Sequence, residues 1–426
     1  MQAGAVKDKL RFYANRIREH LWFRPALMCI VVISAVFLAR TADYLNPAEY
    51  LPDISFETLE KLLTVISGSM LVIATFAVGS MVNAYASASN TATPRSFALV
   101  IADDVSQNAL SAFIGAFIFS IVGLIAVENS YYGRGGRFAL FVLILLVFVI
   151  VILTFVRWVD RIARLGRLGP TIRKVENATA VSMRRRRDNP RMGGVEVTDR
   201  PENAEIVSGS EIGFVQRIDT SVLQEIAEKA SARIEVTTLP GSYVFPGRDL
   251  AVVKPGEGDY EGIDPDDVRE AFVIGDERTF DEDPRFGLVA LSEIASRALS
   301  PGINDPGTAI EVVSSLVRLF TIWSEEPDEE QNDNRPDADR VEIPELSLEE
   351  MFDDGFGAVA RDGAGMVEVV IRLQKALGSL ASRGDEMRKV ADLLSKKSLD
   401  HAEKALELEQ DRERVRKLRS GFFGSS

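Results

Sequence analysis

Residues 138–156 read FALFVLILLVFVIVILTFV, an apolar run without a charged residue that is bounded by Arg137 and Arg157. At 1.5 Å per residue, a helix of nineteen residues spans the roughly 30 Å of hydrocarbon in a bilayer. A helix on the surface of a soluble protein is apolar on one face, whereas this run is apolar on every face. The run therefore predicts a transmembrane helix, and the chain is interpreted as a membrane protein.

Three further segments can cross a membrane: residues 23–39, a stretch that begins near Leu62, and residues 108–127. The second stretch is long enough because no charged residue occurs between Lys61 and Arg95. A cleavable signal peptide is the alternative for the first segment, but the charged stretch before it is long for that role. We therefore predict a four-helix transmembrane domain over residues 23–160, after a basic cytoplasmic N-terminus of residues 1–22.

The charges that flank these segments predict their orientation. Basic residues precede the first segment and follow the fourth, whereas the loop of residues 43–60 carries mainly acidic residues. Positively charged flanks stay on the cytoplasmic side of a membrane, so both termini are predicted to be cytoplasmic. The basic residues are Lys7, Lys9, Arg11, Arg16, Arg18 and Arg24 before the first segment, and Arg157, Arg161, Arg164, Arg167, Arg173, Lys174 and Arg184–Arg187 after the fourth.

Charge divides the chain into two halves. Residues 1–187 hold 21 Lys and Arg against 12 Asp and Glu, and residues 188–426 hold 28 against 51. The acidic half argues against nucleic-acid binding, which needs a basic surface. The basic cluster Arg184, Arg185, Arg186 and Arg187 follows a membrane segment, so we predict that it contacts anionic lipid. With only Cys29, His20 and His401 available, neither a cysteine metal site nor zinc catalysis is expected, and no cofactor is predicted.

The remaining residues predict an α+β domain and a helical tail. Residues 161–210 are interpreted as a basic juxtamembrane helix and linker, and residues 211–323 as a cytoplasmic α+β domain. Residues 324–350 are dominated by Glu, Asp, Asn and Pro and predict a disordered insertion. Residues 351–426 predict a helical C-terminal region. Its charged stretch, residues 385–419, fits either a coiled coil between subunits or a terminal helix packed on its own domain.

Local patterns predict elements inside the α+β domain. Residues 212–218 and 232–239 have the alternation of strands, and a helix over residues 221–231 would be capped by Thr220. The turn residues Pro246 and Gly247 between two short apolar stretches predict a hairpin.

Three Asp-Pro pairs precede helical patterns in this domain. An aspartate before a helix accepts hydrogen bonds from free N–H groups of the first turn, and proline at the first helical position loses nothing by lacking one. An acidic metal site is the alternative interpretation of the same carboxylates. We favour helix capping by Asp264, Asp283 and Asp305, and we predict no metal site.

Two stretches resemble a known family. They are SNTATPRSFALVIADD at residues 89–104 and DERTFDEDPRFGLVALSEIASRALSPGINDPGTA at residues 276–309. With four membrane segments and a cytoplasmic tail, the chain resembles the predicted bacterial membrane proteins called domain of unknown function 2254, over roughly residues 21–380. The resemblance implies the fold, a bacterial origin and an inner-membrane location, but no activity.

The second membrane segment is unusually rich in small and hydroxylated side chains. Close helix packing is one explanation, and a water-filled path is the other. If such a path exists, Thr75, Ser80 and Asn83 are expected to line it, because Thr75 and Asn83 lie about two helical turns apart. No charged residue lies deep in the four segments, which argues against a proton-coupled transporter.

Two functions follow from these patterns. The first is an oligomeric ion or small-solute channel, formed by several copies of the chain, with a regulatory cytoplasmic domain. The alternative is a membrane-anchored sensor or scaffold whose cytoplasmic domain binds a ligand or a protein partner. Its candidate polar cluster comprises Arg278, Asp281, Arg297, Asn304 and Asp305. We do not expect an enzyme, because none of the common catalytic motifs occurs in the sequence.

Overall fold

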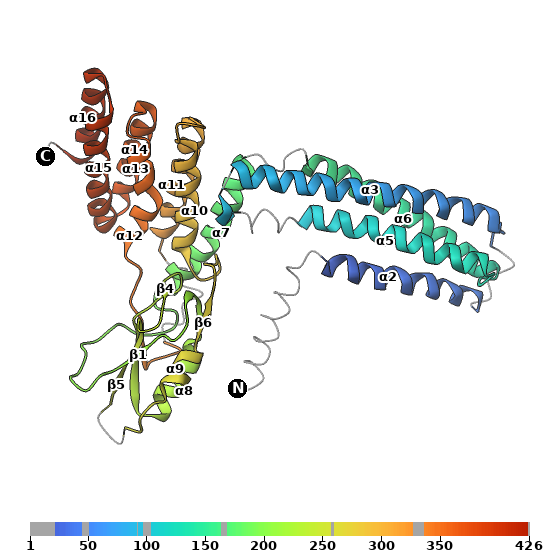
Figure 1. The fold of residues 1–426 in the computed structure, drawn as a ribbon, viewed down its shortest axis with the longest axis horizontal. Coiled ribbons are helices and arrows are strands. Elements are labelled where there is room, and N and C mark those ends of the chain that lie inside the picture. Colours follow the sequence, from blue (N-terminus) through green and yellow to red (C-terminus); the bar gives the residue numbers. More distant parts are fainter. Residues whose placement is uncertain are drawn as a thin grey trace. The chain divides into compact units, whose positions relative to one another are not determined.

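The computed structural model describes residues 22–44, 51–91, 93–96, 104–162, 168–256, 260–326 and 336–424. The chain divides into two compact units, residues 1–170 and residues 171–426 (Figure 1). Each unit has its own core, and each is described by itself below.

The first unit consists of four long apolar helices. They are α2 (Phe23–Ala39), α3 (Phe56–Thr91), α5 (Asp104–Glu128) and α6 (Arg134–Ile162). A short 3-10 helix, η1 (Arg40–Asp43), continues α2. All four helices are long and apolar enough to cross a membrane, as the sequence predicts. At 36 residues, α3 is about 54 Å long and exceeds the thickness of the hydrocarbon layer.

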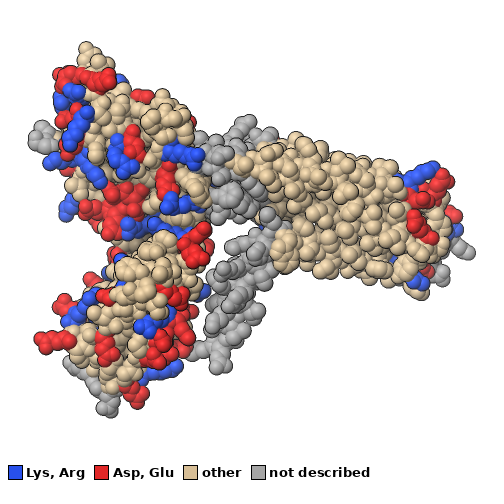
Figure 2. Space-filling view, in the orientation of Figure 1, with Lys and Arg blue, Asp and Glu red and all other residues tan. Residues whose placement is uncertain are grey.

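Side chains fill the space between these helices, and apolar side chains also cover their outer surface. Leu63, Phe113 and Leu140 are fully buried between the helices. Phe148 and Val149 on α6 are each 51% exposed, which is expected of a helix that faces lipid. Figure 2 shows this unit with an uncharged surface along its length and with charged side chains gathered at one end.

Hydrogen bonds fix the charged end of the unit. Asp43 accepts hydrogen bonds from the backbone N–H groups of Gly133 and Gly136, at 2.9 and 2.7 Å, and so caps the start of α6. The Tyr132 hydroxyl donates to the Val36 carbonyl at 2.8 Å. A Cβ atom on Gly135 would lie 2.6 Å from the Ala42 carbonyl oxygen, so glycine is required for this close approach.

The second unit begins with α7 and contains two small sheets and a set of helices. Its elements before the last helices are α7 (Leu168–Asp188), β1 (Glu205–Ser208), β2 (Gly213–Ile218), α8 (Thr220–Lys229), β3 (Ala232–Val236), β4 (Tyr243–Val244), β5 (Asp249–Pro255), α9 (Pro265–Glu270), β6 (Phe272–Gly275) and β7 (Val341–Glu342). One sheet has the order β1-β5-β3-β7 and the other the order β4-β2-β6. All neighbours are antiparallel except β3 and β7, which are parallel.

The helices of the second unit that follow β6 lie side by side in Figure 1. They are α10 (Pro284–Ala298), α11 (Pro306–Trp323), α12 (Leu348–Phe352), the π-helical turn η2 (Asp353–Gly357), α13 (Ala358–Asp362), α14 (Val367–Leu380), η3 (Ala381–Arg383), α15 (Asp385–Ala405) and α16 (Glu409–Phe423). Phe320 of α11 packs on Phe352 and Phe356, with ring centroids 4.3 and 5.5 Å apart. The predicted boundary at residue 323 therefore differs from the structure, because α10 and α11 pack with the C-terminal helices.

The insertion predicted to be disordered is partly ordered. Residues 327–335 lie outside the described residues, but β7 within the insertion pairs with β3, with Val341 opposite Ile234. Val341 and Ile343 are fully buried in the core of the sheet, and the Ser347 hydroxyl caps α12. These few apolar residues supply a strand that the surrounding acidic composition conceals.

Three smaller predictions about the sheets are wrong in detail. Residues 205–208 of the predicted linker form β1, which pairs with β5. The stretches around Pro246 and Gly247 do not form a hairpin, because β4 pairs with β2 whereas β5 pairs with β1 and β3. Asp219 rather than Thr220 caps α8, since its carboxylate accepts from the Val222 N–H.

The C-terminal charged stretch packs on its own domain in this chain. Val370 of α14, Ala402 and Leu406 at the end of α15 and Val415 of α16 form one buried cluster. The Gln374 side chain donates to the Ser395 carbonyl at 2.9 Å and accepts from the Ser395 hydroxyl at 2.6 Å. These contacts use the face of α15 that a coiled coil between subunits would need.

A buried ion network holds the larger sheet together. The Lys254 ammonium group lies 2.6 Å from Glu342 and 2.9 Å from Glu235, and donates to the Thr198 carbonyl at 2.6 Å. These three charged side chains are at most 8% exposed. Arg200 adds a bidentate hydrogen bond to Glu235. All three donors of the ammonium group therefore have partners, as a buried charge requires.

Candidate functional site

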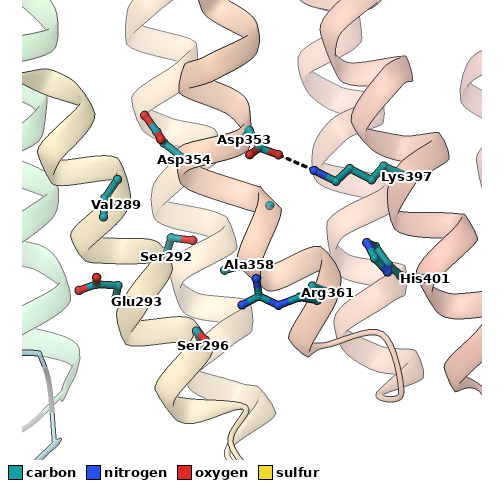
Figure 3. Close-up of a pocket in the computed structure, with 11 residues that line it drawn as sticks. Val289, Ser292, Glu293, Ser296, Asp353, Asp354, Ala358, Arg361, Lys397 and His401 are labelled. Carbon is teal, nitrogen blue, oxygen red and sulfur yellow. Dashed lines mark hydrogen bonds and ion pairs between the residues drawn. The ribbon is translucent and has the colours of Figure 1, made fainter. Parts of the chain in front are cut away.

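A polar hollow of about 390 Å³ lies between α10, the π-helical turn η2 with α13, and α15. The helix from α12 to α13 is continuous, but at residues 353–357 it widens into a π-helical turn with the sequence DDGFG. Such turns insert one extra residue into a helix and occur frequently at functional sites. Figure 3 shows the side chains that line the hollow.

One buried hydroxyl in the hollow lacks a hydrogen-bond partner. Ser292 on α10 is 4% exposed, and its Oγ makes no hydrogen bond within the described part of the chain. Buried polar groups in native proteins are nearly always paired, so this exception needs an explanation. The side chain lines the hollow, where a bound molecule could supply the partner.

Charged side chains of both signs surround this hydroxyl. Asp353 and Lys397 form an ion pair with a separation of 2.6 Å, drawn as a dashed line in Figure 3. Both side chains are more than half exposed, so this pair contributes little to stability and is free to exchange partners. His401 follows Lys397 by one helical turn and points into the same hollow.

A second polar group lies at the α13 end. Asp362 accepts a hydrogen bond from the Ser296 hydroxyl and is bound by Arg361 through two nitrogens, at 2.7 and 3.1 Å. Burial alone would raise the pKa of Asp362, but the hydrogen bonds from Arg361 and Ser296 bring it below its usual value. Asp362 is therefore an anion at neutral pH, and it holds Arg361 beside the hollow.

The side chains around the hollow can bind a small polar molecule. Carboxylate, ammonium, guanidinium and imidazole groups can bind a small polar molecule that carries both donors and acceptors. Because the Ser292 hydroxyl has no partner, it is not paired with His401 as an activated nucleophile would be. Among the described residues, no group of three or more His, Cys, Asp or Glu is placed to hold a metal ion.

A second hollow adjoins the first. It measures about 980 Å³, lies between α12 and α15, and shares Asp353, Asp354 and Lys397 with the polar hollow. Arg285 binds Asp354 at 2.6 Å and also Glu350, which ties the start of α10 to the π-helical turn. The turn therefore forms the common wall of two hollows.

The structure does not bring the predicted polar cluster together. Arg278 and Asp281 lie near the start of α10, where Arg278 binds Asp283 at 2.7 Å. Arg297, Asn304 and Asp305 lie at or after its last turn. A helix of 15 residues is about 22 Å long, so the two groups are far apart.

The three predicted capping residues each stand before a helix and accept backbone hydrogen bonds. Asp264 accepts from Asp266, Asp283 from Phe286, and Asp305 from Thr308. The sequence ALSPGINDPGTA, residues 298–309, forms the tight connection from α10 to α11. Asn304 adopts a φ of 51° there, in the left-handed region that asparagine tolerates.

The predicted pore-lining residues lie on the outer face of α3. Thr75 and Asn83 are exposed and Ser80 is half-buried, but Phe76 is also exposed, at 66%. The buried face of α3 carries Leu63, Met70 and Ala77 instead. A water path along these polar side chains would therefore run outside the packed core, between copies of the chain.

The arginine cluster of α7 is divided between surface and interior. Arg184 and Arg185 are exposed, whereas Arg186 is 5% exposed. Arg187 binds Asp188 and Glu325 and donates to the Ile322 carbonyl. Of the four residues predicted to contact lipid, only Arg184 and Arg185 are exposed.

The residues that line the polar hollow were not predicted as a site. Ser292, Asp353, Arg361, Lys397 and His401 are spread over more than a hundred positions of sequence, and each is ordinary on a solvated helix. The i, i+4 spacing of Lys397 and His401 and the glycines of the DDGFG stretch were the available signals.

Four membrane-length apolar helices followed by an α+β unit are typical of a membrane protein. The chain belongs to the family described as predicted membrane protein (DUF2254), whose model matches residues 18–379. This match confirms the resemblance noted in the sequence.

Relatives in mycobacteria share part of the chain. Uncharacterised proteins of Mycobacterium bovis and Mycobacterium tuberculosis are each 30% identical over 190 residues, which is 42% of this chain and 35% of each relative. The matched region thus spans about a third of the length of these relatives. No solved structure matches the chain.

Proposed function

We propose that the protein is a sensor anchored in the bacterial inner membrane, and that its soluble part binds a small polar ligand in the hollow of Figure 3. The observation that carries this proposal is the buried Ser292 hydroxyl, which has no partner among the described residues and lines a hollow with charges of both signs. A ligand with a hydrogen-bonding group at this point would remove the cost of the unpaired hydroxyl. No catalytic step is part of the proposal.

Opposite faces of α10 contact the ligand hollow and helix α7, which would connect ligand binding to the membrane helices. Ser292 and Ser296 line the hollow, whereas Gly287 packs against Thr179 of α7. Gly287 and Ser296 are nine residues apart, which places them about 180° apart around the helix. In sequence, α7 directly follows the fourth membrane helix, so a shift of α10 on ligand binding would act on the segment that leads to the membrane.

The ligand site is tested by thermal unfolding of the full chain in detergent, with a panel of amino acids and polyols as probes. At least one probe is expected to raise the unfolding temperature of the wild type. Ala358→Leu fills the hollow and should abolish that increase, whereas Ala405→Leu, an exposed position on α15, should retain it. Equal responses of both variants, or no response of the wild type to any probe, would contradict the sensor proposal.

The proposal includes cytoplasmic termini. Basic residues before the first helix and after the fourth support this orientation, and Arg184 and Arg185 are exposed for contact with anionic lipid. Reporter fusions after Ala126 and after Gly169 test it. An extracytoplasmic signal at Gly169 would reverse the orientation.

A channel is the second candidate, and one observation favours it. Thr75 and Asn83 are exposed on α3, and a Cβ added to Gly68 or Gly79 would meet nothing within 4 Å, so this face is open for a second copy. A homo-oligomer that joins these faces would enclose a polar path. Purified protein in a planar bilayer is expected to carry unitary currents that Asn83→Leu reduces; their absence would leave helix packing as the role of this face.

A further inference from the structure

A buried arginine lines a third, smaller hollow of the second unit. Arg186 lies on the buried face of α7, one turn after Ser182 and Met183, and is 5% exposed. The hollow measures about 230 Å³ and lies where the end of α7 meets the end of β2 and the start of α8. Arg185, Arg186 and Arg217 all line it, and Arg185 also donates a hydrogen bond to the Asp281 carbonyl at 3.1 Å.

One edge of the Arg186 guanidinium has no partner. Its Nε and Nη2 atoms are buried and make no hydrogen bond within the part of the chain that the structure describes. Arg200 and Arg318 use the same two atoms to hold a carboxylate, with Arg318 at 2.6 and 2.7 Å from the oxygens of Glu176. The vacant edge of Arg186 is thus the fork that recognises an anion with two oxygens.

Burial of the unpaired Nε and Nη2 atoms of Arg186 lowers the stability of the fold. It lowers the pKa of Arg186 to about 10, so the side chain still carries its charge near neutral pH. Glu282, Asp283 and Glu345 attract Arg186 through space, but none of them accepts a hydrogen bond from the vacant edge. A buried charged donor without an acceptor loses the hydration that it had in the unfolded chain.

The acidic groups around the hollow already have partners. Asp219 accepts hydrogen bonds from Ser221 and Val222 as the cap of α8. Glu282 lies 3.7 Å from Arg217, and burial raises its pKa. Three guanidinium groups against two carboxylates leave a positive balance, and the N-terminus of α8 adds to it.

We propose that this hollow binds a phosphate group, with the Nε and Nη2 atoms of Arg186 as the principal donors and Arg185 and Arg217 as supporting donors. A phosphate offers enough oxygens for more than one guanidinium fork, which a single carboxylate does not. Both vacant nitrogens are buried and the Arg186 side chain lines the hollow, so binding requires this side chain to turn its fork toward the ligand. The group comes either from a soluble phosphate compound or from a lipid headgroup. This site is separate from the hollow of Figure 3 and does not depend on the sensor function.

Calorimetric titration of the full chain in a neutral detergent with inorganic phosphate and with pyrophosphate tests the proposal. Wild type is expected to bind at least one of them, and Arg186→Gln to weaken binding by about tenfold or more, as the loss of a charge-assisted bidentate contact predicts. Arg184→Gln removes the same charge from an exposed position of the same helix and should leave the affinity within about twofold. Glu282→Gln removes a negative charge from the hollow and should tighten binding several-fold.

The source of the phosphate is resolved with nanodiscs. If a lipid headgroup occupies the hollow, nanodiscs with phosphatidic acid should suppress the binding of inorganic phosphate, whereas nanodiscs of phosphatidylcholine alone should not. If the ligand is soluble, both lipid compositions give the same affinity. Equal weakening by Arg186→Gln and Arg184→Gln would overturn the proposal, as would unchanged affinity in Glu282→Gln or a wild type that binds neither phosphate nor phosphatidic acid.

Discussion

Replacement of Lys254 by methionine is expected to lower the local free energy of unfolding of the larger sheet by about 3–5 kcal/mol. The substitution leaves the buried carboxylates of Glu342 and Glu235 without the ammonium group that lies 2.6 and 2.9 Å away. Breaking one side of a buried ion network costs more than the network contributes, because an uncompensated charge remains inside. Hydrogen exchange of the β3 and β5 amides in the full chain measures the effect.

The same network predicts a dependence on pH. Burial raises the pKa of Glu342, but hydrogen bonds from Lys254 and Thr198 lower it below its usual value overall. A carboxylate with a depressed folded pKa stabilises the fold above its unfolded pKa of about 4.3, and this contribution is lost as the pH falls through the folded pKa. The difference in free energy of unfolding between wild type and Lys254→Met should therefore become smaller below about pH 4.

Lys229→Met provides the control, because Lys229 is exposed on α8 and its loss should change stability by about 0.5 kcal/mol or less. If Lys254→Met lowers the free energy of unfolding no more than Lys229→Met does, solvent reaches the ion network and the prediction is wrong. Glu342→Gln combined with Lys254→Met should recover part of the stability, since it removes one of the stranded charges.

Periodicity and composition predict the membrane helices well because the bilayer imposes a simple requirement. Residues 138–156 can be assigned alone, since a run of nineteen residues that is apolar on every face is typical of a membrane span. Capping by Asp264, Asp283 and Asp305 can also be predicted from the sequence, because each of these side chains bonds a backbone N–H group at most three positions further on. These features need no knowledge of distant contacts.

The sheet and the candidate site depend on distant contacts, and for that reason the sequence did not show them. Val341 pairs with Ile234 across more than a hundred residues, and the acidic composition around Val341 suggested disorder. Ser292, Asp353 and Lys397 come from α10, the π-helical turn and α15, which are far apart in the sequence and meet only in the fold. The four arginines of residues 184–187 look alike in the sequence, but in the fold Arg184 and Arg185 are exposed whereas Arg186 is buried.

Both proposed sites depend on the contact between α7 and α10. Arg186 is on α7, and the hollow of Figure 3 is lined by α10. Gly287 of α10 lies against Thr179 of α7. Arg186 lies about two turns after Thr179 on α7, and Ser292 lies less than two turns after Gly287 on α10, so a shift of the two helices at this contact is expected to displace both side chains. Damage to this contact is therefore expected to weaken ligand binding at both sites together.

Gly287→Val is expected to lower the free energy of unfolding by about 2–3 kcal/mol, near the upper end for overpacked sites. A Cβ atom at Gly287 would lie 1.8 Å from Thr179 Oγ1 and 2.7 Å from Thr179 Cβ, so α7 and α10 must move apart. Gly421→Val is the matched control, because a Cβ at this glycine of α16 meets nothing within 4 Å, and we expect a change of about 0.5 kcal/mol or less.

A second substitution, Thr179→Ala, tests whether the clash with Thr179 causes the loss of stability in Gly287→Val. Thr179→Ala removes the atom at 1.8 Å and should recover part of the stability lost in Gly287→Val, with a coupling of about 1 kcal/mol or more between the two sites. Additive effects of the two substitutions would mean that α7 and α10 are not in contact at this position. Thermal unfolding and the phosphate titration should both be measured on wild type, the two single variants and the double variant. Loss of the helix contact should change the phosphate affinity and the unfolding temperature together, whereas loss of the Arg186 site alone should change only the affinity.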